Sequence, residues 1–126
     1  MSIDNAVLCA ADLGDPSVHL ASAALVEAFE PDPEGGWSGV LDGIRIWAAD
    51  RSSLDQDQAS RYDELLGDTV RAILYMNGRA GNFDGWESAE QLAEVVAAAA
   101  RGVYVSLDEE EVLLSPAAPS VAPVKI

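Results

Sequence analysis

The dipeptide Asp42-Gly43 is the feature that most restricts how this chain can fold. It lies inside residues 35–47, where it separates two apolar runs. Both residues of a two-residue hairpin turn take positive φ, so Asp-Gly between apolar runs predicts a tight β-hairpin. A hairpin of this kind joins antiparallel strands. The chain should therefore contain an antiparallel sheet.

Other apolar patterns predict the rest of the strands. Residues 5–11 form a nearly continuous apolar run, which is typical of a buried strand. Residues 69–77 carry apolar side chains at both odd and even positions, which indicates an interior strand covered on each face. Residues 102–107 form another strand, and residues 112–114 should return antiparallel to it.

Three helices are expected between these strands. Residues 16–30 follow an Asp-Pro start and carry an apolar stripe, and residues 53–66 should be capped by Ser53. A third helix should begin at the capping box Ser88-Ala89-Glu90-Gln91 and end at Gly102. The resulting order favours an α+β fold: a mixed, largely antiparallel sheet with about three helices packed mainly on one face. We expect one domain over residues 1–115 and a disordered tail, rich in proline and alanine, over residues 116–126.

The charge balance limits the partners that this domain can meet. Asp and Glu number 22 against seven Lys and Arg, for a net charge of −15, while 49% of the residues are apolar. A disordered acidic chain is poor in apolar residues, so this composition predicts a folded domain with a negative surface. Nucleic acid and anionic membranes would be repelled, and a basic protein would be attracted. No secretory signal or membrane span is apparent, so a cytoplasmic location is expected.

Few residues suit catalysis or metal binding. His19 is the only histidine and lies beside the apolar stripe of its predicted helix; Cys9 is the only cysteine and lies in an apolar run. Zinc sites draw their ligands mostly from these two residue types. The glycine-rich loop 78–85 lacks the ending of a phosphate-binding P-loop. We expect no catalytic site, no cofactor and no metal, and hence no enzyme.

A protein-binding surface is the remaining candidate. Two tryptophans flank the hairpin turn, and tryptophan is enriched at the centres of protein interfaces. Acidic groups should also project from the fold at the start of the helix over residues 53–66 and between the last two strands. The predicted partner-binding residues are Trp37, Asp42, Trp47, Asp55, Asp57, Asp108, Glu109, Glu110 and Glu111.

One stretch of the chain also resembles a known class of proteins. Residues 86–94, a capped helix rich in alanine and glutamate, lead through Gly102 into the strand Val103–Leu107 and an acidic turn at Asp108. This arrangement resembles the C-terminal part of small bacterial immunity proteins, which neutralise toxins of polymorphic or contact-delivered secretion systems. The resemblance implies a cytoplasmic, non-enzymatic inhibitor that binds one toxin tightly. It assigns no binding residues.

The leading hypothesis is therefore an acidic binding protein, an immunity-type inhibitor that blocks a basic toxin or another cationic protein. Two alternatives share the acidic signal. One is a DNA-mimic antagonist, of the kind that phages encode, whose carboxylates would be spaced like phosphates. The other is an accessory subunit of a larger complex.

Overall fold

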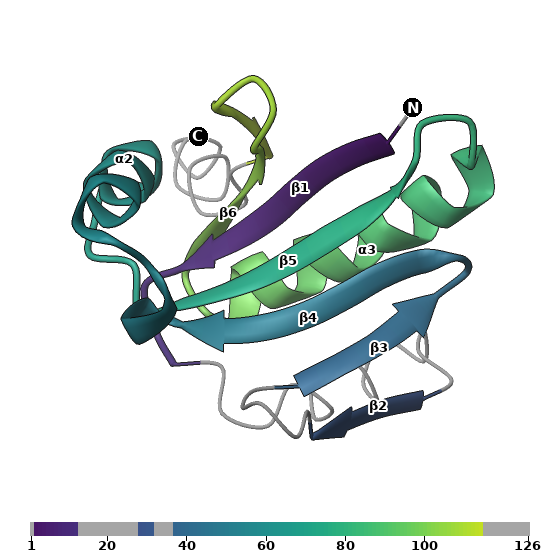
Figure 1. Cartoon of the computed structure of the whole chain (residues 1–126), viewed down its shortest axis with the longest axis horizontal. Helices are drawn as coiled ribbons and strands as arrows, with labels where there is room; N and C mark the ends of the chain where they lie inside the picture. The colour runs from purple at the N-terminus through teal and green to yellow at the C-terminus, as the bar shows by residue number, and fades with distance from the viewer. Residues whose placement is uncertain (1, 13–27, 32–36, 115–126) are drawn as a thin grey trace, which may run out of the picture.

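A computed structural model describes residues 2–12, 28–31 and 37–114, which form an α+β fold around a single antiparallel sheet (Figure 1). The sheet has seven strands in the order β2-β3-β4-β5-β1-β6-β7, and each neighbouring pair is antiparallel. The strands are β1 (Ser2–Cys9), β2 (Ala28–Pro31), β3 (Trp37–Leu41), β4 (Ile44–Asp50), β5 (Ala72–Arg79), β6 (Gly102–Ser106) and β7 (Glu111–Leu114). Among the residues that the structure describes, the helices are the 3-10 turn η1 (Arg51–Ser53), α2 (Gln56–Leu66) and α3 (Phe83–Ala99).

The hairpin predicted from Asp42-Gly43 is confirmed. Leu41 pairs with Ile44 across the turn, and the φ angles of Asp42 and Gly43 are 49° and 87°. Positive φ at both positions gives the turn the twist of the flanking strands. The hairpin therefore lies between the edge strand β2 and the central strand β5.

The centre of the sheet is formed by β1 and β5, which lie far apart in the sequence. β1 pairs with β5 on one side and with β6 on the other. Four consecutive residues of β1, Ala6 to Cys9, have no exposed surface. The predicted burial of both faces of β5 is confirmed, because Ile73 and Leu74 are also fully buried although they point to opposite faces.

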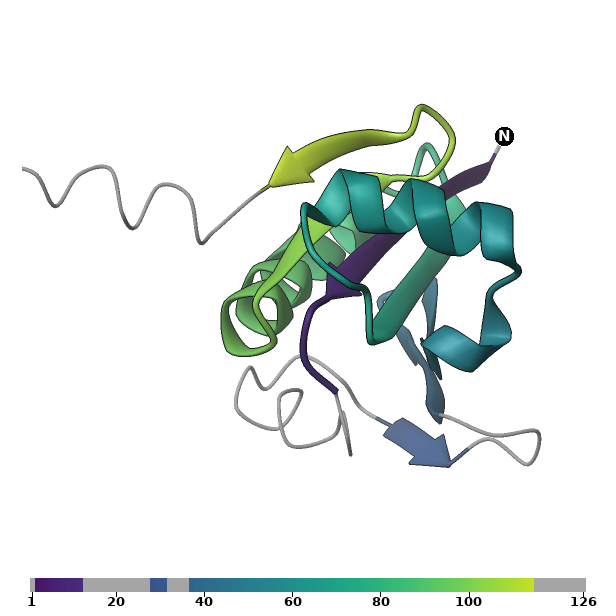
Figure 2. The same cartoon turned by 90° about the vertical axis from the view of Figure 1, so that its left-hand side faces the viewer.

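The two described helices cover opposite faces of the sheet (Figures 1 and 2), so the expectation that helices pack mainly on one face is wrong. On the α3 face, Val7 and Leu74 lie in one core cluster with Leu92 of α3. On the α2 face, Leu8 and Ile73 belong to a second cluster with Tyr62 of α2. The alternation of adjacent strand residues thus supplies apolar side chains to two separate cores.

The predicted helix ends need correction. The first helix was expected to reach Glu30, but Ala28–Pro31 is strand β2, paired with β3. The second is capped by Asp55 and not by Ser53, because Asp55 and Gln58 form a reciprocal capping box. Its predicted end at Gly67 is confirmed, since this residue has a φ of 78°.

The third helix begins six residues earlier than the sequence pattern indicated, because its N-cap is Asn82 and not Ser88. Asn82 caps it by accepting a hydrogen bond from the backbone N–H of Gly85 at 3.0 Å. Ser88 lies inside the helix, and its hydroxyl donates to the Asp42 carboxylate at 2.6 Å. The other predictions on residues 13–27, including His19, and on the tail over residues 116–126 lie outside the described residues.

Candidate functional site

The two tryptophans of the hairpin lie on opposite faces of the sheet. Trp37 is paired with Ala48 and packs against the core on the α3 face. Trp47 points to the α2 face, where its ring stacks on Tyr75 with 5.3 Å between centroids and the Arg45 guanidinium lies 5.4 Å from its centroid. The two rings therefore do not form one binding surface.

Two of the predicted acidic residues hold local structure together. The Asp42 carbonyl accepts a hydrogen bond from the Asn82 side chain at 2.8 Å, so this residue joins the hairpin turn to the start of α3. Asp55 accepts from the backbone N–H of Gln58 at 2.8 Å. Asp57 is exposed in the first turn of α2, where the helix dipole favours a negative charge.

The acidic turn between β6 and β7 is partly occupied by contacts within the fold. Asp108 accepts from the backbone N–H of Asp4 at 3.1 Å, and Glu110 forms an ion pair with Arg61 of α2 at 3.1 Å. Glu109 and Glu111 are exposed. The structure thus distributes the predicted partner-binding residues over the hairpin, the start of α2 and the β6–β7 turn, and their role in binding stays a prediction.

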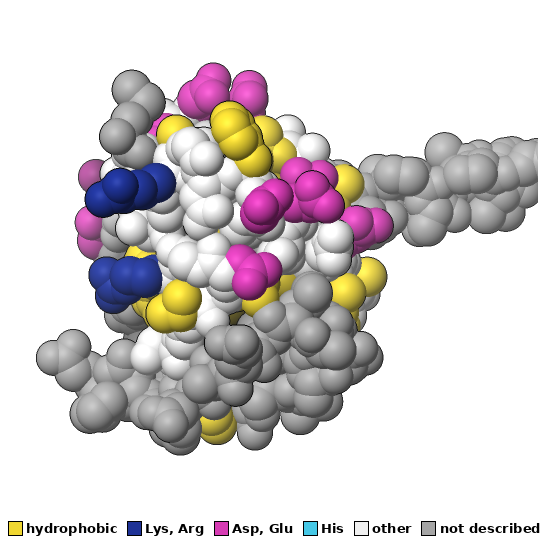
Figure 3. Space-filling view, turned by 90° about the vertical axis from the view of Figure 1, so that its right-hand side faces the viewer, with side chains coloured by type: hydrophobic (Ala, Val, Ile, Leu, Met, Phe, Trp, Pro, Cys, Tyr) yellow, Lys and Arg dark blue, Asp and Glu magenta, His cyan; other side chains and the backbone are white. Residues whose placement is uncertain are grey.

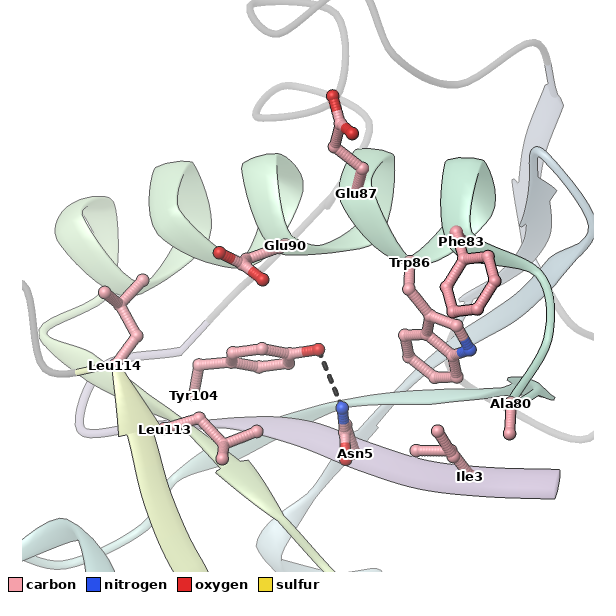
Figure 4. A pocket seen from close by; sticks show the side chains of 10 residues that line it. All are labelled: Ile3, Asn5, Ala80, Phe83, Trp86, Glu87, Glu90, Tyr104, Leu113 and Leu114. Atoms are coloured by element: carbon pink, nitrogen blue, oxygen red, sulfur yellow. Dashed lines mark hydrogen bonds between the residues drawn. The ribbon is translucent and has the colours of Figure 1, made fainter.

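The structure contains a groove that the sequence patterns did not indicate. It lies between α3 and strands β1 and β7, has a volume of about 670 Å³, and we call it the α3–β7 groove (Figure 4). Its apolar lining is mainly aromatic and aliphatic, and its polar lining is an amide, a phenol and two carboxylates. The lining residues are Ile3, Asn5, Ala80, Phe83, Trp86, Glu87, Glu90, Tyr104, Leu113 and Leu114.

The floor of the groove is rigidly held. The Asn5 side-chain amide donates to the Tyr104 hydroxyl at 2.8 Å, and both residues are buried. Burial is the main cause that raises the pKa of Tyr104, so its phenol stays protonated at neutral pH. The indole N–H of Trp86 donates to the Arg79 carbonyl at 2.8 Å, which fixes the orientation of this ring at one end of the groove.

The rim carries exposed apolar and acidic side chains together. Phe83 is 79% exposed and Leu113 is 46% exposed. Phe83, Glu87 and Glu90 follow a spacing of four and then three residues, which places them on one side of α3. Figure 4 shows the Glu90 carboxylate on the side of Tyr104, whereas that of Glu87 points away from the groove.

The wider surface around the start of α3 has the same mixed character. Figure 3 shows acidic side chains gathered beside exposed hydrophobic ones on this side of the molecule, with basic side chains set apart at its edge. Water-exposed apolar groups inside a charged surround are typical of a surface that binds another molecule. The groove is therefore the candidate functional site.

Three other features of the described residues complete the description of the site. Cys9 is fully buried, and burial raises the pKa of its thiol to about 12, so it stays protonated and unreactive in the folded state. Within the described part of the chain, no cluster of three or more His, Cys, Asp or Glu side chains could hold a metal ion. No helix among the described residues is both long and apolar enough to span a membrane.

Comparison with known proteins adds no assignment: the chain matches no protein-family model and no curated protein sequence.

The sequence held a partial signal for the groove. Phe83 and Trp86 stand at the start of α3, where the sequence suggested only that they cover the edge of the core. Ala80, Glu87 and Glu90 lie close to these aromatics in the sequence. The other lining residues do not: those of β1 lie about 80 positions before the aromatics, and those of β6 and β7 lie about 20 to 30 positions after them. Their proximity depends on the strand order, which local periodicity does not specify.

Proposed function

We propose that this protein is a non-catalytic acidic binding protein that captures a cationic protein, in its most specific form an immunity-type inhibitor of a basic toxin in the cytoplasm. The observation that carries the proposal is the α3–β7 groove, which combines exposed aromatic and aliphatic side chains with carboxylates at its rim. The net charge of −15 supports it.

The apolar side chains would supply most of the binding free energy. Phe83 and Leu113 expose much of their surface in the free protein, and covering such surface yields about 25 cal/mol per Å². Aromatic anchors seated in a pocket are the usual sites of highest binding energy in protein interfaces. We therefore expect this apolar lining to determine how long the complex with the partner lasts.

The carboxylates would favour a partner with a positively charged surface. Glu87 and Glu90 are exposed at the rim, and an approaching Lys or Arg side chain can form charge-assisted hydrogen bonds with them. The excess negative charge would also speed encounter with a cationic surface at low salt. The same groups would repel nucleic-acid phosphates, so a protein is the favoured class of partner.

A non-catalytic role agrees with how the groove's polar groups are used. The Asn5 amide and the Tyr104 hydroxyl bond to each other, and burial keeps the phenol protonated. General acid–base catalysis requires a group that exchanges protons near neutral pH within reach of a substrate. The floor of the groove supplies shape and fixed dipoles rather than such a group.

A DNA-mimic antagonist is the second candidate function, and one observation favours it. Glu87, Glu90 and Glu94 are exposed on one side of α3 at intervals of three and four residues. At 1.5 Å per residue these carboxylates recur about every 4.5–6 Å, so they form a row of negative charges along the helix. A protein that normally binds the phosphates of DNA could bind this row. The third alternative, an accessory subunit of a larger complex, would bury the same groove against a sibling subunit.

The test is a binding experiment with matched variants. A partner is first isolated on the immobilised protein, and its affinity is then measured by calorimetry at several salt concentrations. Phe83→Ala should weaken binding about tenfold or more, because it removes an aromatic anchor. Val40→Ala, at a residue 54% exposed on strand β3 and outside the groove lining, is the matched control and should change nothing.

Charge variants test the acidic rim, and competition with duplex DNA separates the two leading candidates. The double variant Glu87→Gln and Glu90→Gln should slow association and flatten the salt dependence, whereas Glu64→Gln on α2 should not. A cationic partner that does not compete with duplex DNA supports the inhibitor. A partner displaced by duplex DNA, and insensitive to Phe83→Ala, supports the DNA mimic. Binding that none of these variants alters would refute a role for the groove.

A further inference from the structure

We infer that the α3–β7 groove binds one arginine side chain of its partner, with the guanidinium group held between the aromatic lining and the Glu90 carboxylate. The inference rests on the function proposed above, since it specifies which chemical group of a cationic partner enters the groove. Three features of the described residues support it: the order of side chains along α3, the unpaired Glu90 carboxylate, and the apolar wall formed by β7.

Aromatic and acidic side chains follow one another along the groove side of α3. Phe83 and Trp86 come first, and Glu87 and Glu90 follow them by four residues each. Residues four apart are neighbours on a helix surface, separated by about 6 Å along the axis. Figure 4 shows that the Glu87 carboxylate points away from the groove. Trp86 and Glu90 are therefore the pair that can act on the same ligand.

The Trp86 ring is held in place by the fold. Its indole N–H donates to the Arg79 carbonyl at 2.8 Å, and part of the ring packs against the core cluster of the α3 face. The ring also lines the groove, and because its N–H is already used, it offers an occupant its π surface. A cation within about 6 Å of a ring centroid is attracted by this surface, and tryptophan attracts it most strongly.

The Glu90 carboxylate has no cation within the described part of the fold. The two ion pairs among the described residues join η1 to α2 and α2 to the β6–β7 turn, so neither lies in the groove. Figure 4 shows the carboxylate on the helix side of the Tyr104 ring. Burial is the main cause that raises the pKa of Tyr104, and the nearby charge of Glu90 raises it further. A cation from another molecule would therefore meet this carboxylate and the aromatic lining together.

The wall formed by β7 suits the stem of a long cationic side chain. The pairing of β6 with β7 is irregular: Tyr104 pairs with Leu114 and Val105 with Val112, which leaves Leu113 as an extra residue. Such a bulge interrupts the alternation of side chains, and Leu113 and Leu114 both line the groove. Arginine and lysine bury their methylene groups along apolar surface of this kind and keep the charged end at a polar group.

The chemistry of the groove favours arginine over lysine. A guanidinium group is planar, stacks on aromatic rings, is weakly hydrated and donates two parallel hydrogen bonds to a carboxylate. An ammonium group is a strongly hydrated point charge, so its transfer into an aromatic groove costs more. The net charge of −15 attracts both cations alike. A preference for arginine would therefore come from the groove and not from the charge of the whole protein.

The test adds arginine that is blocked at both ends, N-acetyl-arginine amide, to the full chain and follows the side-chain N–H signals by NMR. The Trp86 indole and the Asn5 amide should shift in a saturable manner, with an affinity of about millimolar. The indoles of Trp37 and Trp47, which do not line the groove, should stay in place. Blocked lysine should bind at least about threefold more weakly. Blocked citrulline, which has nearly the same shape but no charge, should give no saturable shift.

Matched variants separate the groove from the rest of the acidic surface. Glu90→Gln should weaken blocked arginine about fivefold, because it removes the charge that the guanidinium group meets. Glu94→Gln makes the same change in net charge at an exposed residue one turn further along α3, outside the groove lining, and should leave the affinity unchanged. Trp86→Leu should also weaken binding about fivefold. Glu90→Gln changes an exposed side chain, so it decides the question even where Trp86→Leu lowers stability.

Three results would overturn the inference: a Trp86 signal that blocked arginine does not move, equal binding of arginine and lysine, or equal effects of Glu90→Gln and Glu94→Gln. The function proposed above fails separately. A captured cationic protein that depends on Phe83, together with a Trp86 signal that blocked arginine leaves in place, would refute this inference and keep the proposed function. Arginine bound with the stated selectivity, and no cationic protein captured, would keep the guanidinium site and refute the proposed function.

Discussion

The two faces of the sheet carry side chains of the same strands, yet they are covered differently. On the α3 face, a helix of 17 residues lies across β1, β6 and the hairpin strands. The core cluster on this face reaches across the sheet, from Leu41 of β3 to Tyr104 of β6. On the α2 face, the shorter helix contacts mainly β1 and β6, and the cluster is smaller. Trp47 and Tyr75 lie beside that helix, half-buried and stacked on each other.

The comparison teaches that alternation in a strand decides which residues share a face. The connecting helices decide how much of that face stays exposed to solvent. α3 contributes small and medium apolar residues that let it pack closely, including Ala89, Ala93 and Ala97, all buried. α2 contributes Tyr62 with Leu65 and Leu66, and the two leucines remain partly exposed. We expect the α3 face to hold most of the stability of the fold.

The largest effect should come from a cavity on the better covered face. Leu92 of α3 is fully buried, so Leu92→Ala should lower the free energy of unfolding by about 3 kcal/mol. Leu66→Ala, at the partly buried end of α2, should lower it by about 1 kcal/mol. Urea unfolding followed by fluorescence measures both. Equal losses would contradict the difference between the faces.

Cys9 gives an independent readout of the same prediction. Its thiol lies in the α3-face cluster with a pKa raised to about 12, so it can be alkylated at pH 8 only when the protein opens. A loss of about 3 kcal/mol raises the open population, and hence the labelling rate, by about a hundredfold in the Leu92→Ala variant. Rapid labelling of the unmodified protein would show that this face is not closed.

A smaller effect is expected from the aromatic pair that the α2 face leaves half-exposed. A double-mutant cycle with Trp47→Leu and Tyr75→Leu should give a coupling free energy of about 0.5–1.5 kcal/mol, because the stacked rings lose their contact in either single variant. The matched cycle pairs Trp37→Leu with Tyr75→Leu. Trp37 points to the other face, so these two changes should add with a coupling near zero.

The smallest effect should come from an ion pair whose contribution to stability is lost only at low pH. The Arg51 guanidinium donates to both carboxylate oxygens of Asp63, and together with the N–H of Val70 it lowers the pKa of this carboxyl below its ordinary value of 3.8. The ionised form is thus favoured in the folded state. Its contribution to stability is present above pH 4 and is lost as the pH falls through the lowered pKa.

Unfolding measured between pH 7 and pH 2 tests this prediction. Asp63→Asn should be less stable than the unmodified protein above pH 4, and the two should converge below it. Asp57→Asn changes an exposed carboxylate of the same helix and serves as the control for net charge. A difference between Asp63→Asn and the unmodified protein that stays constant down to pH 2 would show that the ion pair does not act through this proton.

Much of the fold could be predicted from the sequence because its signals are local. A two-residue hairpin turn requires positive φ angles, which few residues accept. Asp42 and Gly43 accept them, so these two positions specified the hairpin. The signal for β5 was local as well. Its apolar residues on both faces indicated an interior strand, because apolar side chains are buried on folding. The start of α3 was misplaced because Ser88-Ala89-Glu90-Gln91 satisfies the capping-box pattern without using it, while Asn82 caps the helix earlier.

The sequence by itself determined the antiparallel hairpin, the alternating strands and the negative surface, because each follows from side chains close together in the chain. Only the tertiary structure decided that β1 lies between β5 and β6, that the helices take opposite faces, and that Asn5, Tyr104 and Phe83 meet around one groove. These depend on contacts between residues up to about a hundred positions apart. Their free energy comes from burying apolar surface jointly, and no single segment carries that information.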